Sequence, residues 1–301
     1  MRKPHGEIRI GISGWRYRGW RGAFYPTALP QKNELSYASS KFTTVEINGT
    51  FYSMQRPASF AAWTAATPDD FVFSLKGPRF ITHMLKLTRA KTPLANFFAS
   101  GVLRLGSKLG PILWQLPPNL GFSTERLEEF FDLLPRSSEA AVQLARHHDA
   151  KLKGRAWLKI DADRRIRHAV EIRHESFRCK EFVNLLRAHD IALVCADSVD
   201  WPLVSDLTSD FAYCRLHGSA ILYASGYGEL ALQTWARRIT AWSRGIPVNE
   251  RRMLIQKPVA DGRKRDVFVY FDNDAKVRAP FDAQSLQSKV DKLLRDRPLR
   301  R

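Results

Sequence analysis

The sequence predicts an α/β protein that forms a single closed (β/α)8, or TIM, barrel. Eight short apolar runs rich in β-branched and aromatic residues alternate with helical patterns along the 301 residues, as they do in parallel sheets built from β/α units. An open doubly wound sheet shows the same alternation. However, the chain carries no G-x-G-x-x-G after a strand, which a dinucleotide-binding sheet would have. We therefore expect the closed barrel, as one domain over residues 1–301.

The predicted elements follow one another in order. The strands are Ile8–Ser13, Thr44–Asn48, Phe71–Lys76, Ile112–Leu116, His168–Arg173, Ile191–Asp197, Phe211–His217 and Val267–Asn273. Helices between them are indicated by caps and by apolar spacing. Thr92-Pro93 and Ser123-Thr124 begin two of these helices, because hydroxyl side chains cap helices and proline suits the first turn.

Other segments differ from a plain β/α repeat. A helix after the seventh strand carries apolar residues at helical spacing, namely Leu232, Trp235, Ile239 and Trp242. The connection 198–210 is too short and too rich in helix breakers for a helix, and an insertion around 138–167 precedes the fifth strand.

Polar residues stand at the carboxyl ends of the predicted strands. Residues two apart on a strand share a face, so Val45 and Ile47 oppose Glu46 and Asn48. The expected inward-facing set, called the polar ring below, consists of Glu46, Asn48, Lys76, Gln115, Glu171, Arg173, Asp197, Arg215, His217 and Asn273. Active sites of (β/α)8 barrels lie at this end, so we expect the functional site there.

The structural alternative for the polar ring is a set of ion pairs that only closes the barrel. Neighbouring strands lie about 5 Å apart, within pairing reach. The pairs would be Lys76–Glu46, Arg215–Asp197 and Arg173–Glu171.

The functional interpretation of the polar ring is acid–base catalysis. Glu171 and Asp197 come from neighbouring strands, and two close carboxylates can raise the pKa of one of them into a range suited to proton transfer. Glu46 is a further acid or base. His217 is the natural proton shuttle, or else a histidine hydrogen-bonded beneath a loop. Asn48, Lys76, Gln115, Arg173, Arg215 and Asn273 are expected to bind the substrate.

A divalent metal ion is an alternative occupant of the polar ring. Its ligands would be Glu46, Glu171, Asp197 and His217. Because the polar ring holds a single histidine and already contains lysine and arginine side chains, we expect neither a metal ion nor an organic cofactor.

Aromatic residues gather in the loops that follow the strands. Trp15, Tyr25 and Tyr52 are expected to bind substrate at the mouth, where rings stack on a base or sugar next to the arginines of the first loop. The alternative is that these rings pack within the loops, as large aromatic side chains usually do.

Composition bears on partners and location. The formal net charge of +18, from 48 Lys and Arg against 30 Asp and Glu, favours an anionic partner, although charge spread over solvated helices would add only solubility.

The 3 cysteines have no C-x-x-C spacing and fit a cytoplasmic protein. The first residues lead into a strand without an apolar signal region, and no long apolar run occurs, so we expect neither a leader nor a membrane span.

Ordered motifs run through nearly the whole chain. They are Gly11–Trp15, Phe24–Pro26, Val45–Tyr52, Phe73–Lys76, Gln115–Pro118, Glu171–Phe177 and Arg215–Gly218. They resemble the YecE-like family, domain of unknown function number 72. The resemblance implies a TIM barrel independently of the strand count, and it implies no catalytic role because the family has no settled activity. After the last strand that family usually reads Asn-Asn-Asp, whereas this chain has Asp272-Asn273-Asp274 and a different loop after it.

Two functional hypotheses follow. The first is an enzyme that acts on a small anionic substrate, such as a phosphorylated sugar or a nucleotide, by acid–base chemistry. The second is a nucleic-acid-binding or nucleic-acid-processing barrel, suggested by the positive charge and the arginine-rich aromatic loop. Binding that weakens steeply with salt would distinguish the second.

Overall fold

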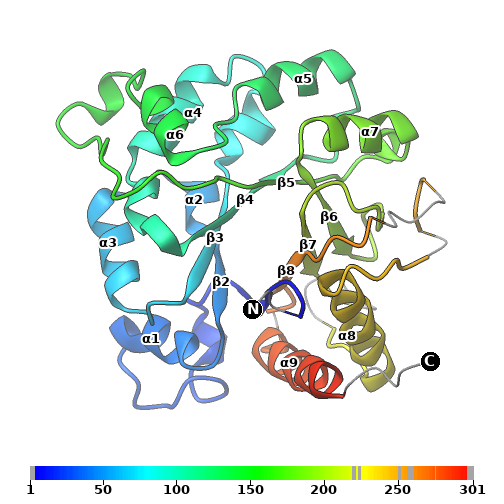
Figure 1. The fold of residues 1–301 in the computed structure, drawn as a ribbon. Coiled ribbons are helices and arrows are strands. Elements are labelled where there is room, and N and C mark those ends of the chain that lie inside the picture. Colours follow the sequence, from blue (N-terminus) through cyan, green and yellow to red (C-terminus); the bar gives the residue numbers. More distant parts are fainter. Residues whose placement is uncertain are drawn as a thin grey trace. The chain divides into compact units, whose positions relative to one another are not determined.

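The barrel is seen in the computed structural model, which describes residues 4–218, 222, 225–249, 252–255, 261–274 and 276–296. Its parallel strands follow one another in chain order, β1 to β8, round a closed barrel (Figure 1). They are β1 (Ile8–Ser13), β2 (Thr44–Ile47), β3 (Val72–Lys76), β4 (Leu109–Gln115), β5 (His168–Glu171), β6 (Ala192–Asp197), β7 (Phe211–Leu216) and β8 (Asp266–Phe271). The predicted TIM barrel is confirmed. The largest difference is at β4, which begins at Leu109 instead of Ile112.

Contacts gather the chain into two compact parts. The middle part comprises residues 31–177 and carries β2 to β5. The terminal part comprises residues 1–30 and 178–301 and carries β1 and β6 to β8.

The middle part has short helices around its strands. They are α1 (Glu34–Ser39), α2 (Gly49–Tyr52), α3 (Pro57–Ala65), α4 (Lys91–Ala99), α5 (Thr124–Asp132) and α6 (Ser138–Ala145), with 3-10 turns at Gln31–Asn33, Val102–Lys108, Ala150–Leu152 and Glu175–Phe177. Helix α4 packs on α6 (Figure 1). Ser123 caps α5 as predicted, because its Oγ accepts a hydrogen bond from Arg126 N.

The exit from β3 is shaped by a close approach of backbone to an aromatic ring. At Gly77 a Cβ atom would lie 2.4 Å from the Trp114 ring, so only glycine fits there. The chain then enters a π-helical turn, Phe80–Met84. After this turn, Lys86, Leu87 and Arg89 have positive φ angles. Such irregular backbone is concentrated at functional sites in proteins generally.

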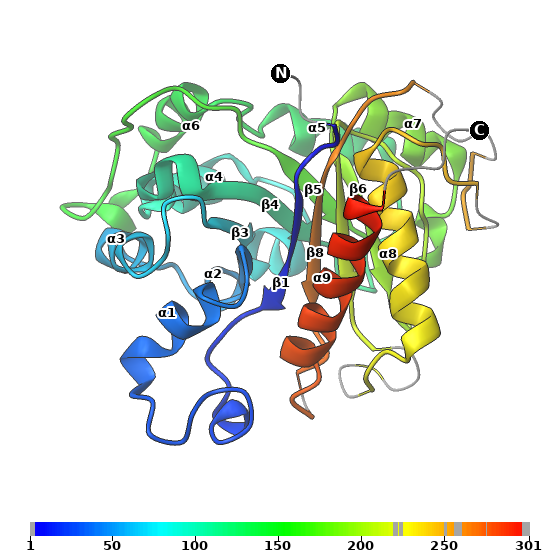
Figure 2. The ribbon, with the colours of Figure 1, turned by 60° about the horizontal axis from the view of Figure 1, so that its bottom comes forward.

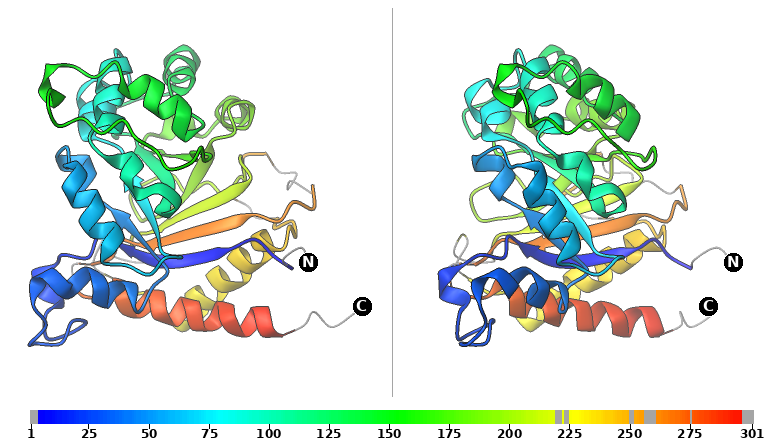
Figure 3. Two further views of the ribbon diagram at one scale, coloured as in Figure 1. Left: turned by 60° about the vertical axis from the view of Figure 1, so that its left-hand side comes forward. Right: turned by 90° about the vertical axis from the view of Figure 1, so that its left-hand side faces the viewer.

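The terminal part is built on four strands in register, with β6 paired to β7. β8 pairs with β7 on one side and with β1 on the other. Its helices are α7 (Lys180–Ala188), α8 (Glu229–Ser243) and α9 (Ala279–Arg295), with a 3-10 turn at Arg18–Trp20. Helices α8 and α9 lie side by side, and α9 packs on β1 (Figures 2 and 3). The apolar stripe predicted on α8 is buried, and residues 198–210 hold no helix, as predicted.

Candidate functional site

The middle part brings several members of the polar ring to one edge of its sheet. Lys76, Gln115 and Glu171 are the last residues of β3, β4 and β5. Gln115 and Glu171 are direct register partners, and Glu46 pairs with Ser74 two residues before Lys76. Partners in a parallel pair face the same way, so the strand register places these polar side chains on one face, as predicted.

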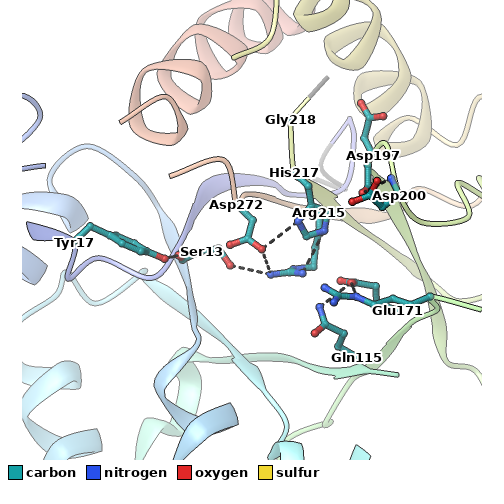
Figure 4. A network of polar contacts seen from close by, with 12 residues as sticks. Ser13, Tyr17, Gln115, Glu171, Asp197, Asp200, Arg215, His217, Gly218 and Asp272 are labelled. Carbon is teal, nitrogen blue, oxygen red and sulfur yellow. Dashed lines mark hydrogen bonds and ion pairs between the residues drawn. The ribbon is translucent and has the colours of Figure 1, made fainter. Parts of the chain in front are cut away.

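Glu171 is a buried carboxyl group with two hydrogen-bond donors. Its side chain is fully buried, and its Oε1 accepts hydrogen bonds from Gln115 Nε2 at 2.8 Å and from Arg173 Nε at 3.2 Å (Figure 4). Donors of this kind offset the cost of removing a carboxylate from water and favour its ionised form. The predicted ion pair between Arg173 and Glu171 is present.

Lys76 is buried against an aromatic face. Its Nζ lies 4.2 Å from the centroid of the Phe51 ring, a cation–π arrangement. Thr50 Oγ1 donates to the Lys76 carbonyl at 2.7 Å, which ties the start of α2 to the end of β3. Glu46 is fully buried and Asn48 is half-buried.

His83 is a candidate that the sequence analysis missed. It lies in the π-helical turn, half-buried, with Nδ1 at 2.9 Å from Thr82 Oγ1 and its ring 5.1 Å from Phe51. Burial, and then the positive charges of Arg173, Lys76 and Arg79, lower the pKa of His83 to about 4 against a smaller opposing effect of Glu171. The imidazole is therefore neutral near pH 7. A histidine in a loop at the carboxyl end of a barrel strand is the signal that points to it.

The terminal part holds a second buried polar group, the Arg215 cluster, made of Ser13, Arg215, His217 and Asp272. Arg215 Nη2 contacts Asp272 Oδ2 at 2.8 Å and Ser13 Oγ at 3.2 Å (Figure 4). The register explains the grouping. Leu216 pairs with Phe271 and Phe271 with Ile12, so the next residues His217, Asp272 and Ser13 stand side by side on the opposite face.

His217 is oriented by two charged neighbours. Its Nδ1 lies 3.1 Å from Asp272 Oδ2, and its Nε2 lies 3.3 Å from Arg215 Nη1. Because guanidinium nitrogens only donate, Nε2 accepts. The ring proton of the neutral form is then on Nδ1, and the imidazole is fully buried.

Two members of the polar ring face the other way. Asp197 is in register with Leu216, so it lies on the helix side, and its Oδ2 accepts a 3.0 Å hydrogen bond from Trp235 Nε1 of α8. The expected Arg215–Asp197 ion pair was wrong, because Arg215 pairs with Asp272 instead.

Asn273 is likewise directed to the helix side. Its Nδ2 donates to Asp282 Oδ2 of α9 at 2.8 Å and to the Ser225 carbonyl at 3.0 Å. The inward position at the end of β8 belongs to Asp272. The expectation erred by one residue because the alternation was counted from the wrong member of Asp272-Asn273-Asp274.

Asp274 is a further titratable group that the sequence analysis missed. Burial and the neighbouring charge of Asp272 raise the pKa of Asp274 to about 6. Two acidic residues flanking Asn273, the last residue of the predicted eighth strand, were the available signal.

Of the three aromatic residues predicted to bind substrate, two are buried within the loops and one is exposed to solvent. Trp15 and Tyr25 are buried, and the Tyr25 hydroxyl donates to the Trp15 carbonyl at 2.7 Å. Tyr25 also packs on Trp20 and Phe24. By contrast Tyr52 is 69% exposed, with its ring against Phe51. Of the three, Tyr52 alone presents its ring to solvent.

The described residues form neither a metal-binding cluster nor a membrane-spanning helix. No group of three or more His, Cys, Asp and Glu side chains there has an arrangement suited to a metal ion. None of the helices described has both the length and the apolar character needed to cross a membrane.

Comparison with known proteins places the chain in a family. The family model described as "Protein of unknown function DUF72" matches residues 9–300. The protein YecE of Escherichia coli K12 is 30% identical over 148 residues, which is 49% of this chain and 51% of that protein. YunF of Bacillus subtilis is 28% identical over 116 residues, 37% of this chain and 40% of YunF. The matched segment thus spans about half or less of these relatives.

Solved structures extend the similarity to nearly the full length. A DUF72 family protein from Thermotoga maritima has a TM-score of 0.71 at 26% identity and covers 96% of this chain and 99% of its own. One from Enterococcus faecalis has a TM-score of 0.66 at 16% identity, covering 94% and 95%, and supports the fold alone. The chain is a member of the DUF72 family, whose function is unknown.

Proposed function

We propose that this protein is an enzyme that acts on a small anionic substrate by acid–base chemistry, with Glu171 as the proton-transferring group. The observation that carries the proposal is the environment of Glu171. It is a fully buried carboxylate at the carboxyl end of β5, held by Gln115 and Arg173. Active sites of this fold lie at the carboxyl ends of the strands.

The contacts of Glu171 favour a role as a base. Two hydrogen-bond donors meet its Oε1, and such donors favour the charged form of a carboxyl group, which is the form that acts as a base. Gln115 also fixes its orientation, which is what a positioned base needs. Glu46 supplies a second buried carboxylate on the same face of the sheet.

Cationic side chains near Glu171 support an anionic substrate. Lys76 Nζ lies 4.2 Å from the Phe51 ring, which the half-buried His83 ring meets at 5.1 Å, and Arg173 Nε lies 3.2 Å from Glu171 Oε1. Pairing with an anion would also stabilise the negative charge that develops when a proton is removed from the substrate. Asn48, Gln115 and Tyr52 are proposed to contact the same substrate.

The Arg215 cluster of the terminal part is proposed to contain an acid–base pair of its own. His217 Nδ1 lies 3.1 Å from Asp272 Oδ2, and a carboxylate beside an imidazole orients it for proton transfer. Arg215 pairs with Asp272 at 2.8 Å and is proposed to act by positioning.

The test of the proposed function is a substitution of Glu171. Purified protein is incubated with a panel of sugar phosphates and nucleoside monophosphates, and conversion is followed by 31P and 1H NMR. Glu171→Gln keeps the shape of the side chain and removes its basicity, so turnover should fall at least a hundredfold. Glu128→Gln, on the exposed side of α5, is the matched control and should turn over normally. Conversion by Glu171→Gln at the wild-type rate would remove Glu171 from the mechanism.

Nucleic-acid binding is a second candidate, favoured by one specific feature. Arg16, Arg18 and Arg21 are all exposed in the loop after β1, in a chain of net charge +18. Phosphate contacts would make affinity for short DNA or RNA fall steeply with salt. Titrations at low and moderate salt test this, and affinity that does not change with salt would rule it out.

A further inference from the structure

The loop between β3 and α4 brings basic groups around one neutral imidazole. We call this group the basic subsite; its members are Lys76, Arg79, His83 and Arg173. Lys76 Nζ and the His83 ring lie against the same Phe51 ring, at 4.2 Å and 5.1 Å from it, and Arg79 directly precedes the π-helical turn that holds His83. The charges of Lys76, Arg79 and Arg173 lower the pKa of His83. Among the charged groups with the largest effects on the pKa of His83, three are cations and Glu171 acts in the opposite sense. Positive charge therefore predominates among these groups.

The contacts of His83 leave one ring nitrogen for a ligand. Nδ1 is 2.9 Å from Thr82 Oγ1; in the tautomer that carries the ring proton on Nε2, Nδ1 accepts from this hydroxyl. The Phe51 ring meets the imidazole edge to face at 5.1 Å and takes up no hydrogen bond. Within the described residues, Nε2 of His83 makes no hydrogen bond of its own.

The position of His83 is maintained by the surrounding backbone. It lies in a π-helical turn that begins four residues after the end of β3. Thr82 beneath it is fully buried, and Gly77 passes directly over Trp114. An imidazole fixed in this way loses little conformational freedom when it binds a ligand.

We propose that the basic subsite binds the phosphate group of a phosphate monoester substrate, with His83 donating to a phosphate oxygen through Nε2. This deepens the proposed function and rests on it for the statement that the bound molecule is a substrate. Lysine and arginine are the usual partners of phosphate, and charge-assisted hydrogen bonds to it are strong. A dianion matches the excess of positive charge better than a monoanionic carboxylate does.

Binding should be coupled to proton uptake. In the free protein His83 is neutral until the pH approaches 4. A bound dianion beside the imidazole favours its charged form and so raises its pKa. Affinity for a dianion should therefore increase as the pH falls from 7 towards 4, and it should level off near pH 4, where the free protein is protonated as well.

The experiment measures sulfate and inorganic phosphate binding by calorimetry, with acetate as the monoanionic comparison. Sulfate remains a dianion between pH 7 and pH 5, so a change in its affinity reports on the protein. We expect sulfate and phosphate to bind better than acetate at pH 7. The affinity of the wild type for sulfate should increase at pH 5, whereas that of His83→Gln should change less.

Exposed arginines supply the variant and its matched control. Arg79→Gln removes a cation of the basic subsite from an exposed position, so folding should be retained. It should weaken sulfate binding roughly tenfold or more, as expected for loss of a charge-assisted contact. Arg89→Gln changes an exposed arginine of the same loop that is not among the main charges lowering the pKa of His83, and it should bind sulfate as the wild type does.

The outcomes separate this proposal from the proposed function. Absence of sulfate and phosphate binding, or wild-type binding by both Arg79→Gln and His83→Gln, would overturn the basic subsite even if Glu171→Gln abolishes turnover. Conversely, binding that depends on Arg79 and His83 would support the basic subsite even if Glu171 proved dispensable for turnover.

Discussion

His168 should make the stability of the protein depend on pH. It begins β5 and is fully buried. Trp114 Nε1 donates to its Nδ1 at 3.1 Å, and its Nε2 lies 2.8 Å from the Pro135 carbonyl. Because Nδ1 accepts, the ring proton is on Nε2 and donates to that carbonyl. Protonation of Nδ1 would break the bond to Trp114, and burial lowers the pKa of His168 from 6.5 to about 3.

The sign and size of the effect follow from proton linkage. Below pH 6.5 the unfolded chain takes up a proton at this position, whereas the folded protein does so only near pH 3. The unfolded state binds more protons in this window, so stability falls as the pH decreases from 6.5 towards 3. At pH 5 the loss is about 2 kcal/mol, from about 1.5 pH units at about 1.4 kcal/mol each. This figure does not depend on the folded-state pKa as long as that pKa is well below 5.

The assay is urea unfolding of the wild type and of His168→Gln at pH 7 and pH 5. A glutamine amide can accept from Trp114 and donate to Pro135, but it does not titrate. The stability advantage of the wild type over the variant should therefore shrink by about 2 kcal/mol between the two pH values. If the two proteins lose stability in parallel, the buried neutral His168 is not the cause and the reasoning fails.

Two further substitutions test the packing around the candidate site. Asp272→Asn removes the anionic partner Asp272 from the fully buried Arg215, so the free energy of unfolding should fall by about 3 kcal/mol or more. As the control, Asp261→Asn in a partly exposed pair with Arg265 should lower it by about 1 kcal/mol or less. Equal losses in the two variants would contradict a buried Arg215–Asp272 ion pair. Gly77→Ala places a Cβ 2.4 Å from the Trp114 ring and should destabilise by roughly 1–3 kcal/mol, measured by thermal unfolding; an unchanged Tm would show that the loop gives way at little cost.

In the middle part, the direction of the strand-end side chains could be predicted from the sequence. Alternation along β2 places Glu46 opposite Val45 and Ile47, and the register of β4 with β5 pairs Gln115 with Glu171. Such predictions succeed because the period of a strand is a local property of the backbone. They need only a correctly placed strand, and buried apolar runs mark strands clearly.

At β6 and β8 the same reasoning was off by one residue. Asp197 and Asn273 end predicted strands and look equivalent to Glu171 in the sequence. In the structure they contact Trp235 of α8 and Asp282 of α9. A shift by one residue moves a side chain to the other face of a sheet. At the end of a strand, pairing with the neighbouring strands decides which residue faces inward. Asp272 was therefore overlooked although it pairs with Arg215.

By itself the sequence determined the order of the strands, the barrel and the family, since these follow from apolar periodicity and from motifs spread along the chain. Tertiary structure decided which polar groups meet. The neutral state of His83 arises from burial and from cations on separate segments, and the pKa of Asp274 arises from burial and a neighbouring charge. These are effects of distance and solvent exclusion in three dimensions, and residue order alone does not specify distances between segments remote along the chain.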